Sequence, residues 1–175
     1  MKIYTKLGDT GYTTLQSNER VRKDHPLIEV IGEIDELNSH VGYLISIMDN
    51  SHDIDFLYQL QNLLFCLSTH FCDEQDSFDL PCSNIENEID FIQKQIPSVN
   101  TFILPGGCKA AAQAHICRSI DRRVERRVIP LLDHYPINRE IVRIFNRISD
   151  YFYVLARKVN FEQGNDEKKW QNTCK

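Results

Sequence analysis

A chain of 175 residues with 42% hydrophobic residues is large and apolar enough for one domain with a sizeable core, and its 7 Gly and 6 Pro exclude disorder over most of its length. A net charge of −5 excludes a general affinity for nucleic acid or for an anionic membrane, so any anion site must be local. No run approaches about eighteen apolar residues, which excludes a membrane-spanning helix.

The cysteine pattern and the N-terminal sequence indicate in which cellular compartment the protein resides. Six cysteines, at positions 66, 72, 82, 108, 117 and 174, form no Cys-x-x-Cys pair and no zinc-ligand spacing. A chain of this size needs no disulfide framework, so we interpret the thiols as reduced and mostly buried. The N-terminus has neither the apolar core of a signal peptide nor the arginines of a transit helix, and we expect a cytoplasmic protein.

Residues 1–25 are polar, rich in Gly and Thr and without an apolar stripe, which predicts a loop that orders on a partner. Five segments with helical periodicity follow, at about 26–48, 53–72, 83–96, 108–133 and 138–162. Asp53 and Asn138 are the predicted caps of the second and fifth, and Pro97 ends the third. The linker "FILPGG" precedes the fourth. We predict one all-α domain over 1–175, with a ferritin-like up-and-down five-helix bundle at 26–164 and a tail at 165–175.

The fourth predicted helix contains "HICRSIDRRVERRV", with five arginines in fourteen residues. At about 100° per residue, one face of this helix is apolar and predicts contact with the core. That face carries Ile120, Val124, Val128 and Leu131. Arg118, Arg122 and Arg126 form a ridge that points away from it, whereas Arg123 and Arg127 lie on another side. Like charges at this spacing repel unless an anion or facing acids compensate them, and guanidinium groups suit phosphate oxygens.

Two other interpretations of this arginine ridge remain open from the helical wheel. A solvated helix face, with Glu125 and Asp121 as local counter-charges, is the commoner origin of such a run. A nucleic-acid grip is disfavoured by the acidic net charge and by the lack of a known RNA or DNA module.

The N-terminal stretch "YTKLGDTGYTTL" also suits an anion, because glycines admit backbone N–H groups and Lys6 and the threonines add donors. The stretch is not a P-loop, since the G-x-x-x-x-G-K-[ST] frame is missing. Its Asp-Thr-Gly triplet matches aspartic proteases, but those enzymes need a β-rich fold and a second aspartate loop. A plain turn or a disordered end is the alternative.

Five motifs in order resemble the PduO-type ATP:cob(I)alamin adenosyltransferases, from residue 2 to about residue 170. They are "YTKLGDTGYTTL", "KDHPLIEVIGEIDELNSHVG", "FILPGG", "CRSIDRRVERRV" and "FNRISDYFYVLAR". The resemblance implies that cobalt(I) of cobalamin attacks C5′ of ATP, which gives adenosylcobalamin and triphosphate. It also implies a homotrimer of five-helix bundles with ATP sites at subunit interfaces.

The resemblance assigns site residues by motif. Those implied to bind ATP are Thr5, Lys6, Leu7, Gly8, Thr13, Thr14, Lys23, Arg122, Arg123, Val124, Glu125, Arg126 and Asn146. Arg118 and Asp35 match a pair that bridges subunits, and Phe102 matches the aromatic residue beneath the corrin ring. Without the resemblance, Asp35 is a flanking acid in water and Phe102 an ordinary core aromatic. A cobalamin reductase and an adenosylcobalamin-dependent enzyme are compatible protein partners.

The implied chemistry suits these residue types. A triphosphate leaving group carries about four negative charges, which Lys and Arg stabilise. Mg²⁺, held mainly through the ATP phosphates, would share that role, so we expect no protein metal site. Cobalt(I) is itself the nucleophile, so no general base is needed. An apolar wedge at Phe102 would exclude the lower axial ligand and make cobalt(II) easier to reduce.

Some residues depart from the family pattern. Ile120, Asp121 and Val124 stand where small or neutral residues are usual, and Asp121 adds a negative charge beside Arg122.

An adenosylcobalamin carrier or nucleotide sensor on the same bundle is the alternative function. An interaction bundle for acidic partners or RNA is a second, but it gives no reason for the N-terminal loop or for Lys23.

Overall fold

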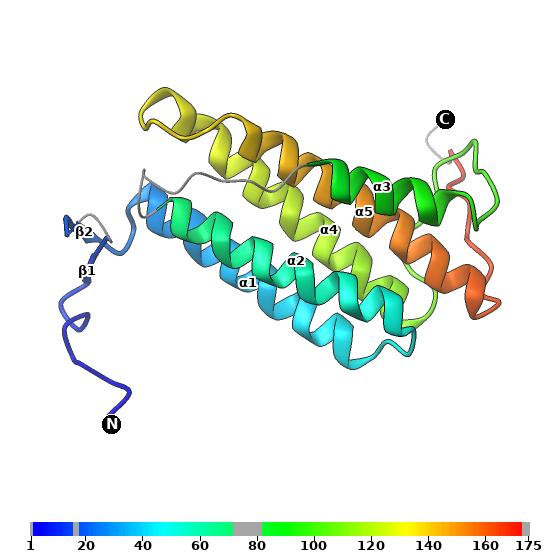
Figure 1. The fold of residues 1–175 in the computed structure, drawn as a ribbon, viewed down its shortest axis with the longest axis horizontal. Coiled ribbons are helices and arrows are strands. Elements are labelled where there is room, and N and C mark those ends of the chain that lie inside the picture. Colours follow the sequence, from blue (N-terminus) through cyan, green and yellow to red (C-terminus); the bar gives the residue numbers. More distant parts are fainter. Residues whose placement is uncertain (1, 16–17, 72–81, 173–175) are drawn as a thin grey trace.

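A computed structural model describes residues 2–15, 18–71 and 82–172. Within these residues the chain forms five α-helices, a 3₁₀-helix and two short strands (Figure 1). The helices are α1 (Pro26–Ser46), α2 (Ser51–His70), α3 (Cys82–Gln93), α4 (Lys109–Val128) and α5 (Glu140–Glu162), and η1 (Ile129–Asp133) follows α4. The five-helix prediction is confirmed, and each helix lies within a few residues of its expected range.

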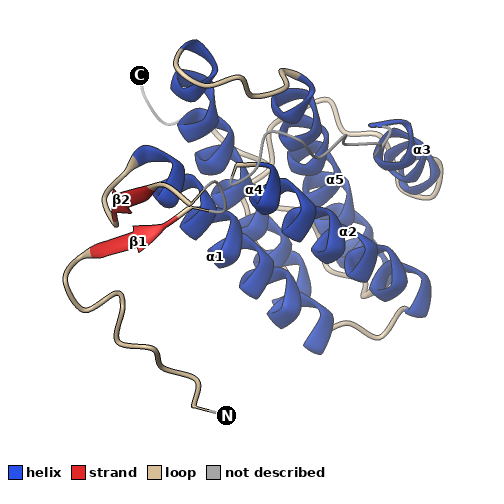
Figure 2. Ribbon diagram, turned by 60° about the vertical axis from the view of Figure 1, so that its left-hand side comes forward, coloured by secondary structure: helices blue, strands red, loops and turns tan. Residues whose placement is uncertain are grey.

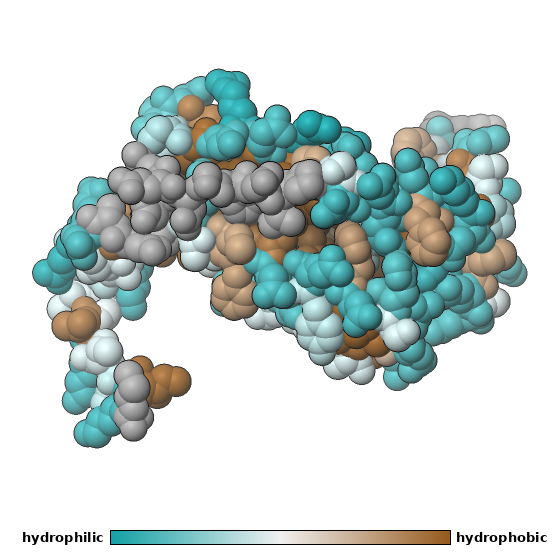
Figure 3. Space-filling view, viewed as in Figure 1, coloured by the Kyte–Doolittle hydropathy of each residue, from teal (hydrophilic) through white to brown (hydrophobic). Residues whose placement is uncertain are grey.

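α4 is the central helix of the bundle. It packs against α5 on one side and α1 on the other, while α2 packs on α1 and α3 on α5. Val124 and Val128 on the predicted core face are fully buried, and Ile120 and Leu131 nearly so. Each such apolar side chain stabilises the fold by about 1.5–3 kcal/mol. On the face shown in Figure 3, hydrophilic residues cover most of the bundle and apolar residues show in smaller areas between them.

A two-stranded antiparallel sheet precedes α1 and was not expected. β1 (Tyr12–Thr14) pairs with β2 (Arg20–Arg22), with Thr13 opposite Val21 (Figure 2). Leu15 and Val21 are buried, so the hairpin contributes two apolar side chains to the core. Such a short strand alternates over too few residues for its period to be recognised in the sequence.

The predicted cap of α2 is wrong. Asn50 caps this helix, its side-chain oxygen accepting from the Asp53 N–H at 3.3 Å. Asp53 instead points inward, is fully buried and accepts from Lys158 Nζ of α5 at 2.5 Å. A buried ammonium needs a carboxylate beside it, and that partner lies 105 residues away in the sequence.

At the start of α5 and the end of α4, the helix boundary depends on a nearby asparagine or proline. Asn138 accepts from the Glu140 N–H at 3.0 Å, as its predicted capping role requires, although α5 itself begins at Glu140. α4 ends at Val128, earlier than predicted, and gives way to the 3₁₀ turn of η1. Pro130 has no N–H for the next helical hydrogen bond, which explains the change.

The thiols are less buried than predicted. Cys82 and Cys117 are buried, Cys108 is half-buried and Cys66 is exposed, and these four are free, while positions 72 and 174 lie outside the described residues. Burial raises the pKa of the Cys117 thiol to about 12, so this thiol is unreactive. Among the helices of the described ranges, none is long and apolar enough to cross a membrane.

Asp121 lies inside the bundle, so the expectation that it adds a charge beside the arginine ridge is wrong. On the wheel it falls at the edge of the core face, and in the structure it is fully buried. Neither of its carboxylate oxygens has a hydrogen-bond partner among the described residues. Burial, and then the nearby carboxylate of Glu125, raise the pKa of Asp121 well above its usual value.

We predict that Asp121→Asn stabilises the protein at neutral pH. The folded state holds the Asp121 proton more tightly than the unfolded chain, so the wild type loses about 1.4 kcal/mol per pH unit between the unfolded pKa, near 4, and the raised folded pKa. Asparagine carries no proton to lose. Thermal unfolding from pH 4 to pH 8 should show a gain in Tm that grows with pH.

The control for this measurement is Asp90→Asn, which neutralises an exposed carboxylate on α3. It should leave the pH dependence of Tm unchanged. A gain for Asp121→Asn that is independent of pH would contradict a raised pKa in the folded state.

Candidate active site

Two arginines of α4 are engaged by carboxylates of α1. The guanidinium of Arg123 contacts Glu36, and its Nε lies 3.5 Å from Oε1 of Glu33. Arg127 Nε lies 3.5 Å from the same oxygen. These contacts fix the side of α4 that faces α1. The sequence-based division of the five arginines into two sets is therefore confirmed.

The ridge formed by Arg118, Arg122 and Arg126 has no facing acids: no ion pair within the described residues includes any of the three. Arg126 Nη1 donates to the Arg122 carbonyl at 2.8 Å, which turns the Arg126 guanidinium back toward the turn that carries Arg122. Arg118 is half-buried, and its Nε has no hydrogen-bond partner in the described part of the chain. Burial and the charge of Arg122 lower the pKa of Arg118. No ion pair of the described residues engages the ridge, so it suits an external anion.

The N-terminal loop forms a defined turn. The N–H of Gly11 donates to the Gly8 carbonyl at 3.2 Å, and the N–H of Lys23 donates to the Gly11 carbonyl at 2.9 Å. A Cβ at Gly8 would lie 2.9 Å from Lys23 Nζ, so the end of the lysine side chain lies close against this glycine. The turn thus places the Lys23 ammonium against the loop's backbone.

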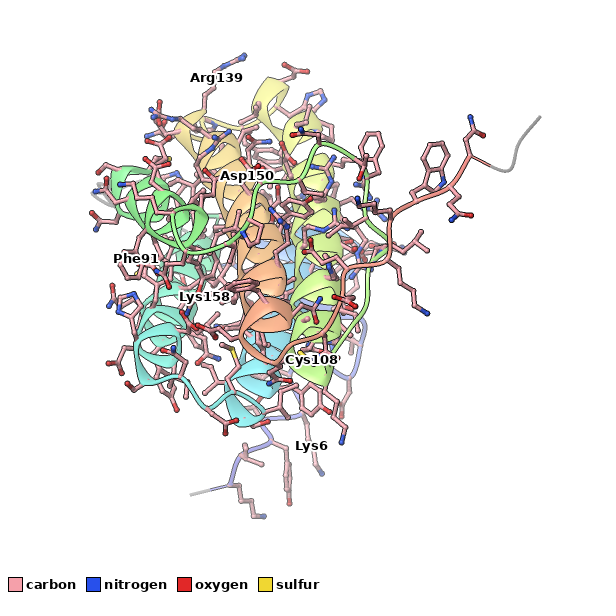
Figure 4. All side chains as sticks on the ribbon, turned by 90° about the vertical axis from the view of Figure 1, so that its right-hand side faces the viewer. Lys6, Phe91, Cys108, Arg139, Asp150 and Lys158 are labelled. Atoms are coloured by element: carbon pink, nitrogen blue, oxygen red, sulfur yellow. The ribbon has the colours of Figure 1, made fainter. Side chains whose placement is uncertain are left out.

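Other predicted ligands on this segment are accessible. Thr5, Lys6, Leu7 and Thr14 are exposed, and Thr13 is half-buried. Figure 4 shows Lys6 outside the helical bundle. Arg20 Nη2 donates to Thr10 Oγ1 at 3.3 Å, and its guanidinium lies 4.9 Å from the centre of the Tyr12 ring. The loop and hairpin therefore present hydroxyls and cations on one small unit.

The remaining nucleotide-site predictions lie on α4 and α5. Val124 is fully buried, so its side chain cannot contact a ligand outside the bundle, and Glu125 beside it is half-buried. Asn146 on α5 is half-buried, and its side-chain oxygen accepts from Arg147. We therefore keep Asn146 and the ridge arginines as candidate ligands, exclude the side chain of Val124, and note that Arg123, also a predicted ligand, pairs with Glu33 and Glu36 instead.

Asp35 lies exposed on α1, and no ion pair of the described residues involves it. It does not contact Arg118 of its own chain. Both members of the predicted pair are therefore open to a residue of another subunit.

Phe102 is exposed over 80% of its surface, so the alternative that it is a core aromatic is wrong. Its only ring neighbour among the described residues is Trp170, edge-on with ring centres 6.4 Å apart. The backbone on both sides pairs with the C-terminal segment, since Trp170 N–H donates to the Phe102 carbonyl at 2.8 Å and Leu104 N–H to the Lys168 carbonyl at 2.7 Å. Sequence reasoning missed this pairing and assigned residues 165–175 to a tail.

The two groups of site residues lie at opposite ends of one protomer. The start of α1 lies beside the end of α4 and η1, where Pro26, Arg127 and Leu131 line one pocket. Phe102 lies in the connection before α4, and Pro105 of this connection lines another pocket with Ala112 and Arg123 of α4. α4 has 20 residues and so separates these ends by about 30 Å. In Figure 1 the hairpin and the C-terminus occupy the two ends of the bundle.

Comparisons with known proteins agree with this geometry. Residues 3–159 match the family model for cobalamin adenosyltransferase. The corrinoid adenosyltransferase of Bacillus subtilis is 36% identical over 183 residues, which cover 99% of this chain and 94% of the relative. Corrinoid adenosyltransferase MMAB of Homo sapiens is 33% identical over 186 residues, covering 95% and 72%.

Solved structures with a similar fold are also corrinoid adenosyltransferases. A variant PduO-type ATP:corrinoid adenosyltransferase from Lactobacillus reuteri, complexed with cobalamin and ATP, superposes with a TM-score of 0.91 at 34% identity, covering 98% of this chain and 100% of that one. Another variant of this type, complexed with ATP, has a TM-score of 0.89 at 34% identity, covering 97% and 100%. The chain therefore belongs to the cobalamin adenosyltransferase family.

Proposed function

We propose that the chain transfers the 5′-deoxyadenosyl group of ATP to cobalt(I) of cob(I)alamin, with the arginine ridge of α4 as the seat of the triphosphate. The observation that carries this proposal is the division of the arginines. Carboxylates of α1 engage Arg123 and Arg127, whereas no ion pair of the described residues includes Arg122 or Arg126. An uncompensated row of guanidinium groups on a rigid helix is preorganised for phosphate oxygens.

The N-terminal turn supplies the second phosphate ligand set. Lys23 Nζ is held against Gly8, and the exposed hydroxyls of Thr5 and Thr14 lie on the same small unit. Mg²⁺ would arrive on the triphosphate, whose hard oxygens it prefers.

The reaction needs no proton transfer. An electron pair on cobalt(I) forms the bond to C5′, the C5′–O bond breaks, and its electron pair leaves with triphosphate. The protein's task is then to hold the phosphates, to balance the charge that develops on the leaving group, and to bring cobalt to C5′. Phe102 would act earlier, by excluding the lower axial ligand so that four-coordinate cobalt(II) accepts an electron more readily.

The separation within one protomer supports a site shared between subunits. The N-terminal hairpin lies at one end of the bundle and the C-terminal segment that pairs with Phe102 at the other (Figure 1), whereas cobalt must contact C5′ directly. A homotrimer with Asp35 of one subunit on Arg118 of the next would meet this requirement. We retain a cytoplasmic location, and a cobalamin reductase and an adenosylcobalamin-dependent enzyme as compatible partners, as part of the proposal.

We predict that the purified protein converts chemically reduced cobalamin to adenosylcobalamin when ATP and Mg²⁺ are supplied without oxygen. The change in the corrin absorption spectrum measures the product. Binding of ATP and cobalamin without any such change would instead indicate the carrier or sensor.

We predict that Arg122→Ala lowers kcat/KM for ATP by about 100-fold or more, the loss typical of one charge-stabilising group. Arg123→Ala should have a much smaller effect on turnover, because this side chain pairs with Glu33 and Glu36. It serves as the matched control, since both variants remove one guanidinium from the same turn of α4. Equal losses of activity would contradict the division of the arginines into two sets.

We predict that Phe102→Ala impairs turnover from cobalt(II) with a reductant far more than turnover from pre-reduced cobalt(I). The exposed ring packs on no core residue, so its loss should leave Tm nearly unchanged. Steady-state rates from the two starting states give the comparison. A similar loss in both assays would eliminate the wedge role.

A further inference from the structure

The connection between α3 and α4 carries Phe102, and side chains of α5 hold both ends of it. Near its start, Arg157 Nη2 donates to the Pro97 carbonyl at 2.7 Å. At its end, Asn160 Nδ2 donates to the Gly106 carbonyl at 2.9 Å, and Asn160 Oδ1 accepts from the Cys108 N–H at 3.0 Å. Phe102 lies between these anchors, five residues after the first and four before the second.

Asn160 is built closely into this connection. The side chain is only 3% exposed, and one amide satisfies both a carbonyl and an N–H of the loop. A Cβ at Gly107 would lie 2.0 Å from Asn160 Oδ1, and Gly107 has a φ of +105°. Only glycine fits here, because a side chain would both clash and strain the backbone. The glycine pair of "LPGG" thus admits the amide of α5.

Arg157 ties the same loop to the C-terminal segment. It is 8% exposed, and its Nε donates to Glu167 Oε1 at 2.9 Å while Nη2 holds Pro97. The segment after Glu167 then pairs with the backbone on both sides of Phe102 through the bridge between Ile103 and Lys169. Figure 4 shows the C-terminal segment running beside the connection that leads to α4, to the right of the bundle. One buried guanidinium therefore fixes both strands of this small ladder.

We propose that Asn160 and Arg157 are positioning residues for the transferase reaction, which hold the Phe102 ring where it meets the corrin. The inference rests on the proposed function, and in particular on the wedge role of Phe102. The ring contacts no core side chain that could fix it, so its position depends on the backbone that these two residues anchor. A wedge must be held firmly, because a displacement of about 1 Å at a reacting centre can cost about 100-fold in rate.

The test compares Asn160→Ala with Asn38→Ala. Asn38 is also buried, and its amide donates to the Gln61 carbonyl at 3.3 Å between α1 and α2, away from the Phe102 connection. Both variants should lower Tm. Asn160→Ala should reduce turnover from cobalt(II) about ten- to 100-fold more than turnover from pre-reduced cobalt(I), with KM for ATP unchanged. It should also weaken the spectrum of four-coordinate cobalt(II), and Asn38→Ala should alter neither readout.

A second variant and a second measurement keep the test decisive. Arg157→Lys keeps a charge for Glu167 but loses the fork that also reaches Pro97, and should shift the ratio of the two rates in the same direction. Hydrogen exchange should quicken at residues 97–108 in both variants and not in Asn38→Ala. That readout does not depend on activity.

The outcomes separate this inference from the function it rests on. If Phe102→Ala depresses the cobalt(II) reaction selectively but folded Asn160→Ala and Arg157→Lys do not, the positioning role alone is overturned. If Phe102→Ala shows no selective loss, the wedge role and this inference both fail. Adenosylcobalamin formation by the wild type in the same assay shows whether the transferase function itself stands.

Discussion

The rotation of α4 about its own axis determines which of its arginines can meet a ligand. Burial of Val124 and Val128 sets this rotation, since each contributes about 1.5–3 kcal/mol, whereas exposed ion pairs are worth about 0–1 kcal/mol. The contacts of Arg123 and Arg127 with α1 therefore follow from the packing and neutralise one side of the helix. The opposite side keeps its positive charge, and this asymmetry makes an acidic protein locally suited to a triphosphate.

Helical periodicity predicts this part of the molecule because it depends only on spacing along the chain. Helical periodicity does not predict whether neighbouring helices bury a residue at the edge of the apolar face. Asp121 lies at such an edge, and only the approach of neighbouring helices decides that it is buried. Asp53 resembled a cap by position, yet it serves as the counter-charge of Lys158, 105 residues away. Both errors concern tertiary neighbours, which single-sequence patterns do not contain.

Some residues of the candidate site could likewise be predicted from the sequence, and others could not. The arginine ridge could be predicted from the helical wheel, whereas Phe102 was assigned only through the family resemblance. Their supports could not, because Arg157 and Asn160 act on a loop more than fifty residues earlier in the chain. The glycine pair of this loop indicated only part of this arrangement. Gly106-Gly107 predicted an irregular linker, but a glycine at a positive φ also marks a place where another group approaches closely, and here that group is an amide of α5.

Arg118 links the fold to the assembly that we propose. It lies about midway along α4, between the phosphate-binding end and the Phe102 end, and its guanidinium is partly buried with an Nε that lacks a partner in the described protomer. A guanidinium stays charged in proteins, so this desolvation is a cost until an acid reaches it. Asp35 is exposed and unpaired on α1 of the same described chain. A contact between these two groups of different subunits would remove the cost at the point where ATP and corrin must meet, so that assembly and completion of the site become one event.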